Sequence, residues 1–293
     1  MPFYADNAWH GPVVIQENTP MARDTYRVRF ACPEIARRTV PGQFVMLRLA
    51  GCNDPLLGRA LAVYNVTPDA EGRPTFIELV YLLVGKMTHR LADLPVGMKL
   101  EAWGPLGNGF LCSTAPATSA ASSVEHLVMV AGGIGQTPFL TLAREQLGLQ
   151  TYGDPPRRVE KAKRVTLCYG AQSKDFFAGL DDFRQAGVEV HLSTDDGTAG
   201  TRGLVTSLIP PVVKKSPWPC TIVSCGSEPM LAAVCAVAEK LNVPCQVSLE
   251  SPMACGIGIC FSCVKKIRDA SGQWDYRRTC VEGPVFNAAD VEF

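Results

Sequence analysis

Four cysteines near the C-terminal end of the chain have the side-chain type and the spacing that metal–sulfur chemistry needs. Cys255, Cys260 and Cys263 lie within nine residues, and Cys280 follows. This is the C-x₄-C-x₂-C…C spacing of plant-type [2Fe–2S] proteins, in which each of two irons takes two cysteine thiolates. Two glycines between the first two cysteines allow a tight loop whose backbone N–H groups point at the sulfurs.

Two other interpretations of the cysteines stay open at this point, a structural zinc site and four unligated thiols. Zinc sites usually combine two CxxC pairs, and this segment holds only one. The other eight cysteines are scattered singly, many in apolar segments, as is usual for reduced core thiols. The spacing therefore favours a cluster on these four ligands.

A glycine-rich turn in the middle of the chain has the context of a phosphate-binding site. Gly132, Gly133 and Gly135 follow a predicted strand and precede a predicted helix. Such glycines let a diphosphate approach the backbone N–H groups at a helix N-terminus. Thr137 is expected to cap the helix and Pro138 to occupy its first turn. The alternative is a strand-to-helix turn with no ligand.

A second turn with possible ligand contacts comprises Cys225, Gly226, Pro229 and Met230. It lies between a predicted strand and a predicted helix, where open α/β sheets bind their ligands. A nicotinamide ring is the candidate. The alternative is a buried thiol followed by an ordinary helix cap.

The elements that must position these residues divide the chain into two fold types. Short β-rich runs separated by Pro and Gly turns predict an N-terminal antiparallel barrel. A Ser/Thr/Ala/Pro-rich stretch at 113–123 predicts a linker. Alternating strands and helices then predict a parallel, doubly wound α/β sheet. We expect a barrel at 1–112, a linker at 113–124, a nucleotide-binding domain at 125–249 and a small cluster module at 250–293.

Within the nucleotide-binding domain, the hydrophobic pattern predicts individual elements. The expected strands are 126–131, 164–170, 188–193, 221–225 and 245–249, the expected helices are 138–147, 174–185, 204–209 and 228–241, and 148–163 is expected as an inserted loop.

The overall composition narrows the class of protein. The chain has 293 residues with 47% hydrophobic and 19% charged residues, as in a well-packed globular protein. Its 28 basic and 28 acidic residues balance, so no net charge favours nucleic acid or an anionic membrane. We expect a cytoplasmic protein, because neither a signal peptide nor an apolar run long enough to span a bilayer is visible.

The order of barrel, glycine turn at 132–138 and cysteine turn at 225–230 resembles the ferredoxin–NADP⁺ reductase superfamily. The cysteine segment 253–263, with matches at 104–110 and 194–197, makes the chain resemble the electron-transfer subunits of NAD-dependent dihydroorotate dehydrogenases. The resemblance implies FAD on the barrel, NADH on the α/β domain and a [2Fe–2S] cluster at the end of the chain. It also implies a separate FMN-containing catalytic subunit of pyrimidine biosynthesis, in a heterotetramer with two copies of each chain.

The same resemblance assigns FAD contacts to the barrel strand that begins at Arg59. The Arg-Pro-x-Ser pattern of the family corresponds here to Arg59, Ala60, Leu61 and Ala62. Arg59 keeps the cation that pairs with the FAD diphosphate. Ala62 lacks the hydroxyl of the family's serine, and Ala60 lacks the rigidity of proline.

A second departure from the family lies beside the expected diphosphate. The family's Gly-x-Gly-Thr pattern corresponds to residues 85–88, in which Met87 is expected to narrow the approach and Thr88 to donate a hydrogen bond. Val80, Tyr81 and Leu82 on the preceding strand would flank the same cofactor. The alternative for these three is an ordinary apolar strand.

The choice between NADH and NADPH depends on the residues after the second strand of the α/β domain. Gln172 offers no guanidinium for a 2′-phosphate, although Lys174 is near, and Asp195 is a candidate for a ribose hydroxyl. These residues favour NADH.

We therefore expect the chain to act as an electron-transfer subunit in which a flavin stands between NADH and the iron–sulfur cluster. NADH gives two electrons together and a cluster takes one at a time, and a flavin can do both. One alternative is a diaphorase subunit of a hydrogenase, sulfide-linked or transhydrogenase complex. Another is a flavin-free regulatory subunit, suggested by Ala60, Ala62 and Met87.

Overall fold

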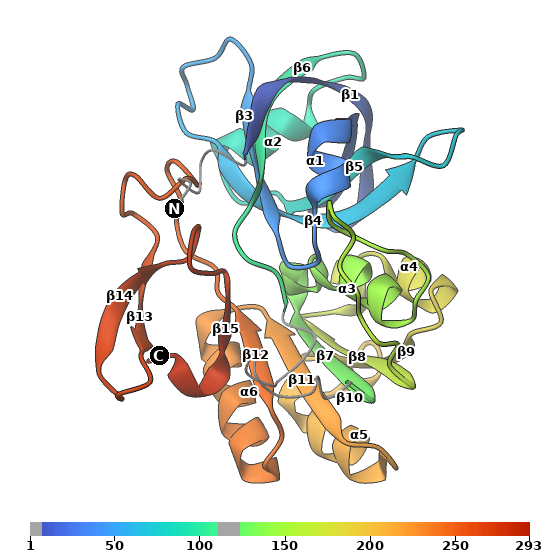
Figure 1. The fold of residues 1–293 in the computed structure, drawn as a ribbon. Helices are drawn as coiled ribbons and strands as arrows, with labels where there is room; N and C mark the ends of the chain where they lie inside the picture. Colours follow the sequence, from blue (N-terminus) through green and yellow to red (C-terminus); the bar gives the residue numbers. More distant parts are fainter. Residues whose placement is uncertain (1–7, 111–123) are drawn as a thin grey trace.

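The computed structural model describes residues 8–110 and 124–293, which form three adjoining parts (Figure 1). A β-barrel lies at the top of the view and an α/β domain lies below it. The C-terminal segment runs along one side and meets both. The fold class predicted from the sequence is confirmed, whereas the expected linker at 113–123 lies outside the described residues.

The barrel is closed and entirely antiparallel, with strand order β1-β2-β5-β4-β3-β6. Its inward-facing residues alternate with outward-facing ones, as the period of a strand requires. On β6, for example, Leu100, Ala102 and Leu106 are fully buried, while the alternate residues Glu101, Trp103 and Pro105 are partly exposed. The elements are β1 (Trp9–Ala22), β2 (Thr25–Ala31), α1 (Pro33–Arg38), β3 (Phe44–Leu49), β4 (Arg59–Pro68), β5 (Pro74–Leu82), α2 (Lys86–Ala92) and β6 (Lys99–Leu106).

The α/β domain is built on a seven-stranded sheet of order β10-β9-β8-β7-β11-β12-β15. Its central strands are buried on both faces. On β7, Leu127 and Met129 pack into the cluster that includes α3 (Phe139–Gln146) and α4 (Leu180–Gln185). Val128 and Val130 pack toward α5 (Ile209–Lys215) and α6 (Glu228–Leu241). The strands are β7 (His126–Gly132), β8 (Arg164–Ala171), β9 (Glu189–Thr194), β10 (Thr201–Arg202), β11 (Cys220–Cys225) and β12 (Cys245–Ser248).

Two of the four helices predicted for this domain are present in the structure, and the other two differ from the prediction. The expected helices 138–147 and 228–241 are confirmed as α3 (Phe139–Gln146) and α6 (Glu228–Leu241). The expected helix 174–185 is wrong in its middle, because Gly179 has φ 72° and separates η3 (Lys174–Phe176) from α4 (Leu180–Gln185). The expected helix 204–209 instead becomes η4 (Val205–Leu208) and α5 (Ile209–Lys215).

Two physical reasons account for these differences. At Gly179 a Cβ would lie 2.2 Å from the hydroxyl of the barrel residue Tyr64, so tertiary packing selects the break. In α5 two prolines occupy the first turn. Proline lacks a backbone N–H, and in the first turn of a helix that group would have no hydrogen-bond partner within the helix. No helix within 8–110 or 124–293 is both long and apolar enough to cross a membrane.

The inserted loop at 148–163 forms no regular element, as predicted, yet it connects the two domains. Tyr152 is 3% exposed and packs into the barrel core. Arg157 donates hydrogen bonds to Glu145 of α3, at 2.6 Å, and to the carbonyl oxygen of Phe110, at 3.0 Å. The loop therefore helps to hold the barrel against the sheet.

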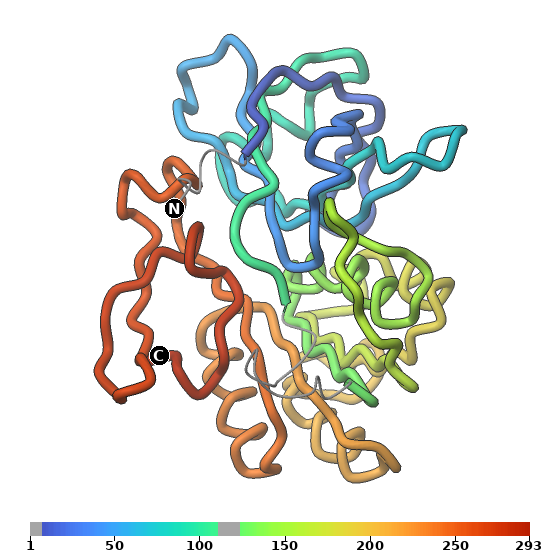
Figure 2. The backbone as a smooth tube through the Cα atoms, in the orientation of Figure 1, coloured from blue at the N-terminus to red at the C-terminus, as the bar shows by residue number. Residues whose placement is uncertain are grey.

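The C-terminal segment is joined to both other parts of the molecule. Its regular elements begin with a hairpin of β13 (Val264–Arg268) and β14 (Trp274–Arg278). Strand β15 (Val285–Asn287) and the short helix η5 (Ala288–Asp290) follow. Strand β15 pairs antiparallel with β12 and so extends the nucleotide-domain sheet. The side chain of Asn108, just after β6, donates to the carbonyl oxygens of Glu282 and Val285 and accepts from the N–H of Val285. In the tube trace of Figure 2 this segment, in orange and red, runs along the side of the barrel and of the α/β domain.

His126 is a fully buried ionisable group at the start of β7. Its two ring nitrogens lie 2.8 Å from the hydroxyl oxygens of Ser216 and Thr166. Burial, assisted by the nearby cation of Arg164, lowers the pKa of His126 to about 4. The folded chain therefore holds a neutral imidazole at neutral pH.

This buried histidine predicts a loss of stability in mild acid. In the unfolded chain His126 binds a proton as the pH falls below about 6.5, whereas in the folded chain it binds one only near pH 4. The free energy of unfolding therefore declines between these two pH values. We expect urea unfolding to give a free energy lower by roughly 1–2 kcal/mol at pH 5 than at pH 7.5. His126→Asn should remove most of this difference, whereas the half-exposed His191→Asn should keep it. An undiminished pH difference in His126→Asn would contradict the assignment.

A candidate relay of two cavities and four cysteines

A cavity of about 580 Å³ lies between the barrel and the α/β domain, and we call it the barrel cavity. One wall is formed by β4 and β5 of the barrel. The opposite wall is formed by the start of α3, the end of β11 and the segment 248–253. Most of the residues predicted to contact FAD lie in these walls: Arg59, Ala60, Leu61, Ala62, Val80, Tyr81, Leu82 and Thr88. Thr137 and Pro138, predicted for the glycine turn, and Cys225, predicted for the nicotinamide turn, line the same cavity.

One end of the barrel cavity carries the groups that suit a phosphate. Arg59 is exposed there, and its guanidinium donates to the carbonyl oxygen of Gly58 at 3.0 Å. The hydroxyl of Thr88 donates to the carbonyl oxygen of Gly85 and accepts from the backbone N–H groups of Val84 and Gly85. Thr88 thus caps α2 and fixes the turn at this end.

Met87 does not have the position that the sequence suggested. It is fully buried in the barrel core and is not part of the cavity wall. The reason is the helical geometry of α2, which turns Met87 inward while Thr88 and Gly85 face the cavity. The expected narrowing by Met87 is therefore wrong.

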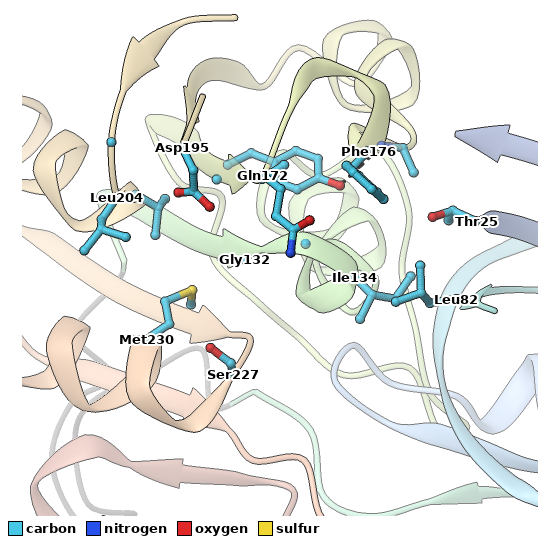
Figure 3. Close-up of a pocket in the computed structure, with 17 residues that line it drawn as sticks. Thr25, Leu82, Gly132, Ile134, Gln172, Phe176, Asp195, Leu204, Ser227 and Met230 are labelled. Carbon is cyan, nitrogen blue, oxygen red and sulfur yellow. Dashed lines mark hydrogen bonds between the residues drawn. The ribbon is translucent and has the colours of Figure 1, made fainter. Parts of the chain in front are cut away.

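A second cavity of about 380 Å³, the sheet cavity, lies at the carboxyl ends of β7, β8 and β11 (Figure 3). Gly132 and Gly133 form its floor, and Met230 reaches it from α6. Gln172 and Asp195 extend into it from the ends of β8 and β9. This is the edge at which open α/β sheets bind nucleotides.

Three other residues of the two turns, Gly135, Gly226 and Pro229, shape the backbone and do not line either cavity. A Cβ at Gly135 would lie 2.2 Å from the carbonyl oxygen of Cys225, so this glycine lets the turn pack against the end of β11. Pro229 lies in the first turn of α6, and Gly226 makes room for Met230. The expected cap by Thr137 is wrong, because α3 has no side-chain cap.

The two cavities meet at shared residues. Leu82 of the barrel and Ile134 of the glycine turn lie in the walls of both. Cys225 lines the barrel cavity and Ser227, two residues later, lines the sheet cavity. A ligand in one cavity would therefore approach a ligand in the other near Leu82 and Ile134.

The four cysteines predicted as cluster ligands lie in one loop and the turn that faces it. The strongest interactions among their thiols join Cys255 with Cys260 and Cys263 with Cys280, and Cys255 acts more weakly on Cys280. The backbone N–H of Ile257 points at the sulfur of Cys255 at 3.4 Å. The loop needs left-handed backbone at Gly256 and Gly258, with φ of 71° and 82°.

The two pairs differ in their surroundings. Cys263 and Cys280 are buried, whereas Cys260 is exposed. Hydrogen bonds from Ser262 lower the pKa of Cys260 to about 6, and burial raises the pKa of Cys280 to about 12. All the cysteines that the structure describes are free thiols.

In the described part of the chain, no three His, Cys, Asp or Glu side chains gather as ligands of a single metal ion. A [2Fe–2S] cluster makes a different demand, because each iron takes only two protein thiolates. The arrangement in two pairs, with backbone N–H groups aimed at the sulfurs, fits that demand.

A packed layer separates the buried cysteines from the barrel cavity. Phe44 and Met46 of β3 and Leu106 of β6 contact Cys263 and Cys280 in one hydrophobic cluster. Phe44 also lines the barrel cavity. The indole N–H of Trp103 donates to the carbonyl oxygen of Cys255 at 2.8 Å, which fixes the loop on the barrel.

Sequence analysis missed several residues of the barrel cavity. The segment 248–253 contributes Ser248, Glu250 and Met253 among others, and β3 contributes Phe44. The position of 248–253 at the carboxyl end of the predicted strand 245–249 could have indicated the first three. Nothing in the local pattern distinguishes Phe44 from an ordinary core residue.

The contact at Gly135 gives a prediction for stability. Gly135→Ala would place a methyl group against the backbone of Cys225, which cannot move without disturbing β11, so we expect a loss of about 3 kcal/mol. Gly132→Ala is the matched control, because its methyl group would meet only the flexible end of Met230. Urea unfolding of both variants without nucleotide tests this. Equal losses in the two variants would contradict the assigned role of Gly135.

Comparison with known proteins agrees with this geometry. Residues 12–110 match the oxidoreductase FAD-binding domain family, and residues 250–292 match the iron-sulfur cluster binding domain of dihydroorotate dehydrogenase B. A solved structure described as an NADH-dependent reduced ferredoxin-NADP oxidoreductase, studied for flavin-based electron bifurcation, is similar over 96% of this chain and 89% of its own. Its TM-score is 0.74 with 25% identity.

Curated relatives extend over nearly the whole chain. The dihydroorotate dehydrogenase B (NAD⁺) electron transfer subunit of Desulforamulus reducens is 35% identical over 92% of this chain and 94% of its own. The subunit of the same name from Shouchella clausii is 33% identical over 96% and 97%. With FAD and a [2Fe–2S] cluster as its cofactors, the chain belongs to the family of electron transfer subunits of dihydroorotate dehydrogenase B.

Proposed function

We propose that this chain exchanges electrons between NADH, bound in the sheet cavity, and an FMN-containing catalytic subunit that acts on dihydroorotate. The observation that carries the proposal is the continuity of the three sites. Leu82 and Ile134 join the two cavities, and Phe44 joins the barrel cavity to the buried cysteines. FAD supplies the change from two-electron to one-electron transfer when bound.

The barrel cavity fits FAD in shape and in the chemistry of its two ends. Arg59 and the turn before α2 would hold the diphosphate. The apolar strands β4 and β5, with Ala62 and Tyr81, would cover the ring system. This fit favours the flavoprotein over a flavin-free regulator, because replacing the family's serine by Ala62 leaves the cavity open.

The sheet cavity suits NADH better than NADPH. Its described lining contains no lysine or arginine, and its one acid is Asp195. A carboxylate at this edge can accept a hydrogen bond from a ribose hydroxyl and repels a 2′-phosphate. Gly132 and Gly133 leave room for the diphosphate, and Met230 would contact the nicotinamide end.

The cysteine pairs suggest how the ligands would be divided between the irons. Cys255 and Cys260 would hold one iron, and Cys263 and Cys280 the other. The first pair lies nearer the surface, where Ile259 and Phe261 are 71% and 61% exposed. Exposed apolar side chains beside an electron carrier suit a protein partner, which we propose is the catalytic subunit.

The relatives are electron transfer subunits by name, and we propose that this chain joins its catalytic subunit in a heterotetramer with two copies of each chain, as the resemblance implies. The free thiols throughout the described residues suit a reducing compartment, and we place the assembly in the cytoplasm.

Reconstitution with the partner tests this function. The purified chain should show flavin absorbance near 450 nm. It should couple NADH oxidation to orotate reduction, or NAD⁺ reduction to dihydroorotate oxidation, only after an FMN-containing dihydroorotate dehydrogenase subunit is added. A chain that binds FAD but gives no linked turnover would instead favour the diaphorase alternative. The observation that supports this second candidate function is the similarity to the ferredoxin-NADP oxidoreductase structure.

The proposed partner surface gives a mutational prediction. Ile259→Asp places a charge on the exposed side of the cysteine loop, so we expect at least about tenfold weaker binding of the catalytic subunit, a cost of about 1.4 kcal/mol. Leu149→Asp, at a residue 60% exposed on the α/β domain, is the control and should bind normally. Calorimetric titration measures both, with cluster and flavin absorbance checked first. Unchanged binding by Ile259→Asp would exclude this surface.

Loss of a cluster ligand should loosen the C-terminal segment more than the rest. We expect Cys260→Ser to increase hydrogen exchange in residues 251–281, whereas the barrel strands and β7 keep their protection because their cores lie elsewhere. Exchange measured by mass spectrometry checks this. Loosening of all three parts together would mean that the cluster supports the whole fold.

A further inference from the structure

Two cysteines outside the cysteine loop, Cys235 and Cys245, meet in the α/β domain. Cys235 lies in the middle of α6, and Cys245 is the first residue of β12. Both are free thiols, and both are partly exposed. Neither belongs to the described residues that line the barrel cavity or the sheet cavity, so the proposed electron relay does not account for this pair.

The register of the helix on the strand brings the two side chains together. Leu231 of α6 and Val247 of β12 pack in one hydrophobic cluster, and both cysteines pack against it. Cys235 follows Leu231 by one helical turn, on the same face and about 6 Å along the axis. Cys245 precedes Val247 by two residues, on the same face of the strand and about 6.6 Å along it. Because β11 and β12 are parallel, the connecting helix runs in the opposite direction, and the two steps lead to the same place.

The two thiols also interact directly. The thiol of Cys245 donates a hydrogen bond to the sulfur of Cys235. This bond lowers the pKa of Cys235, and the same bond together with burial raises the pKa of Cys245. Cys235 is therefore the sulfur that ionises first, and thiolates are the reactive form of cysteine.

Other cysteines of the chain have different surroundings. Cys168 and Cys225 are buried, and burial raises the pKa of each thiol, which keeps them unreactive. Cys52 is partly exposed, but its sulfur bonds to the carbonyl oxygen of Asp54 and to the guanidinium of Arg90. The contact between Cys235 and Cys245 instead offers a second thiol to a first one that has been oxidised.

We propose that Cys235 and Cys245 form a site of reversible oxidation by hydroperoxides, at which the two thiols become a disulfide that ties α6 to β12. The site goes beyond the electron relay, and the proposal does not depend on a catalytic subunit. Disulfides in reducing compartments are usually transient and redox-sensing, as a reversible bond here would be.

The reaction balances with hydrogen peroxide as the oxidant. The sulfur of Cys235 attacks one peroxide oxygen, the O–O bond breaks, and the leaving hydroxide takes the thiol proton to become water. The product is a sulfenic acid on Cys235. The sulfur of Cys245 then attacks the oxidised sulfur, and the hydroxyl group leaves as water with the proton of Cys245. Two thiols and one peroxide give one disulfide and two waters, and a dithiol reductant reverses the change by exchange.

The pair suits a chain that carries a flavin. Reduced flavins react with oxygen, so a flavoprotein meets the reduced products of oxygen. A single partly exposed thiolate would continue from sulfenic to sulfinic acid, which ordinary thiols do not restore. With Cys245 in contact, oxidation of Cys235 stops at a disulfide.

Peptide mapping of the oxidised chain tests the proposal. The chain with FAD and cluster bound is treated anaerobically with one equivalent of hydrogen peroxide, the remaining thiols are alkylated, and the digest is analysed by tandem mass spectrometry. We expect a link between Cys235 and Cys245 as the main product, reversed by dithiothreitol, with unchanged cluster absorbance. Cys52→Ser, which removes another partly exposed cysteine, is the control and should give the same yield.

Two further variants separate the roles of the thiols. In Cys245→Ser the new hydroxyl can still donate to the sulfur of Cys235, so dimedone should trap a sulfenic acid there. In Cys235→Ser we expect Cys245 to react at least about tenfold more slowly. A main product at Cys52 or at the cluster cysteines would overturn the proposal, and so would equal reactivity of the two variants.

Discussion

The packing of the C-terminal segment against the barrel is the interaction on which the arrangement depends. Phe44, Met46 and Leu106 contact the two buried cysteines on one side, and Phe44 lines the barrel cavity on the other. One layer of side chains therefore separates the cluster ligands from the cavity. The polar contacts of Asn108 and Trp103 fix the register of this packing, because each bonds to backbone of the C-terminal segment.

The same segment also completes the α/β sheet. Strand β15 pairs with β12, so the turn that carries Cys280 is held between barrel and sheet. Residues 248–253, which connect β12 to the cysteine loop, then become a wall of the barrel cavity. One short stretch of chain thus links the edge of the α/β sheet, the barrel cavity and the cysteines.

The sequence predicted much of this because its strongest signals are local. Strands such as β7 and β11 and the helix α6 follow from hydrophobic period and capping residues close in the chain. The same local logic failed at Gly179, where the hydroxyl of Tyr64 from another domain decides that the helix breaks. The expectation for Met87 came from the family pattern instead, and it failed because the inward turn of α2 depends on a barrel core that no local pattern describes.

By itself, the sequence predicted the four cysteines as cluster ligands, the order of barrel, α/β domain and cysteine segment, and the two turns after strands, since cysteine spacing and glycine turns carry their chemistry within a few residues. Only the tertiary structure decided which residues share a wall. Phe44, Glu250 and Cys225 are far apart in the chain, and their meeting depends on strand register and on packing between domains. The four cysteines were evident from their spacing, whereas their position one layer from the barrel cavity was decided by long-range packing.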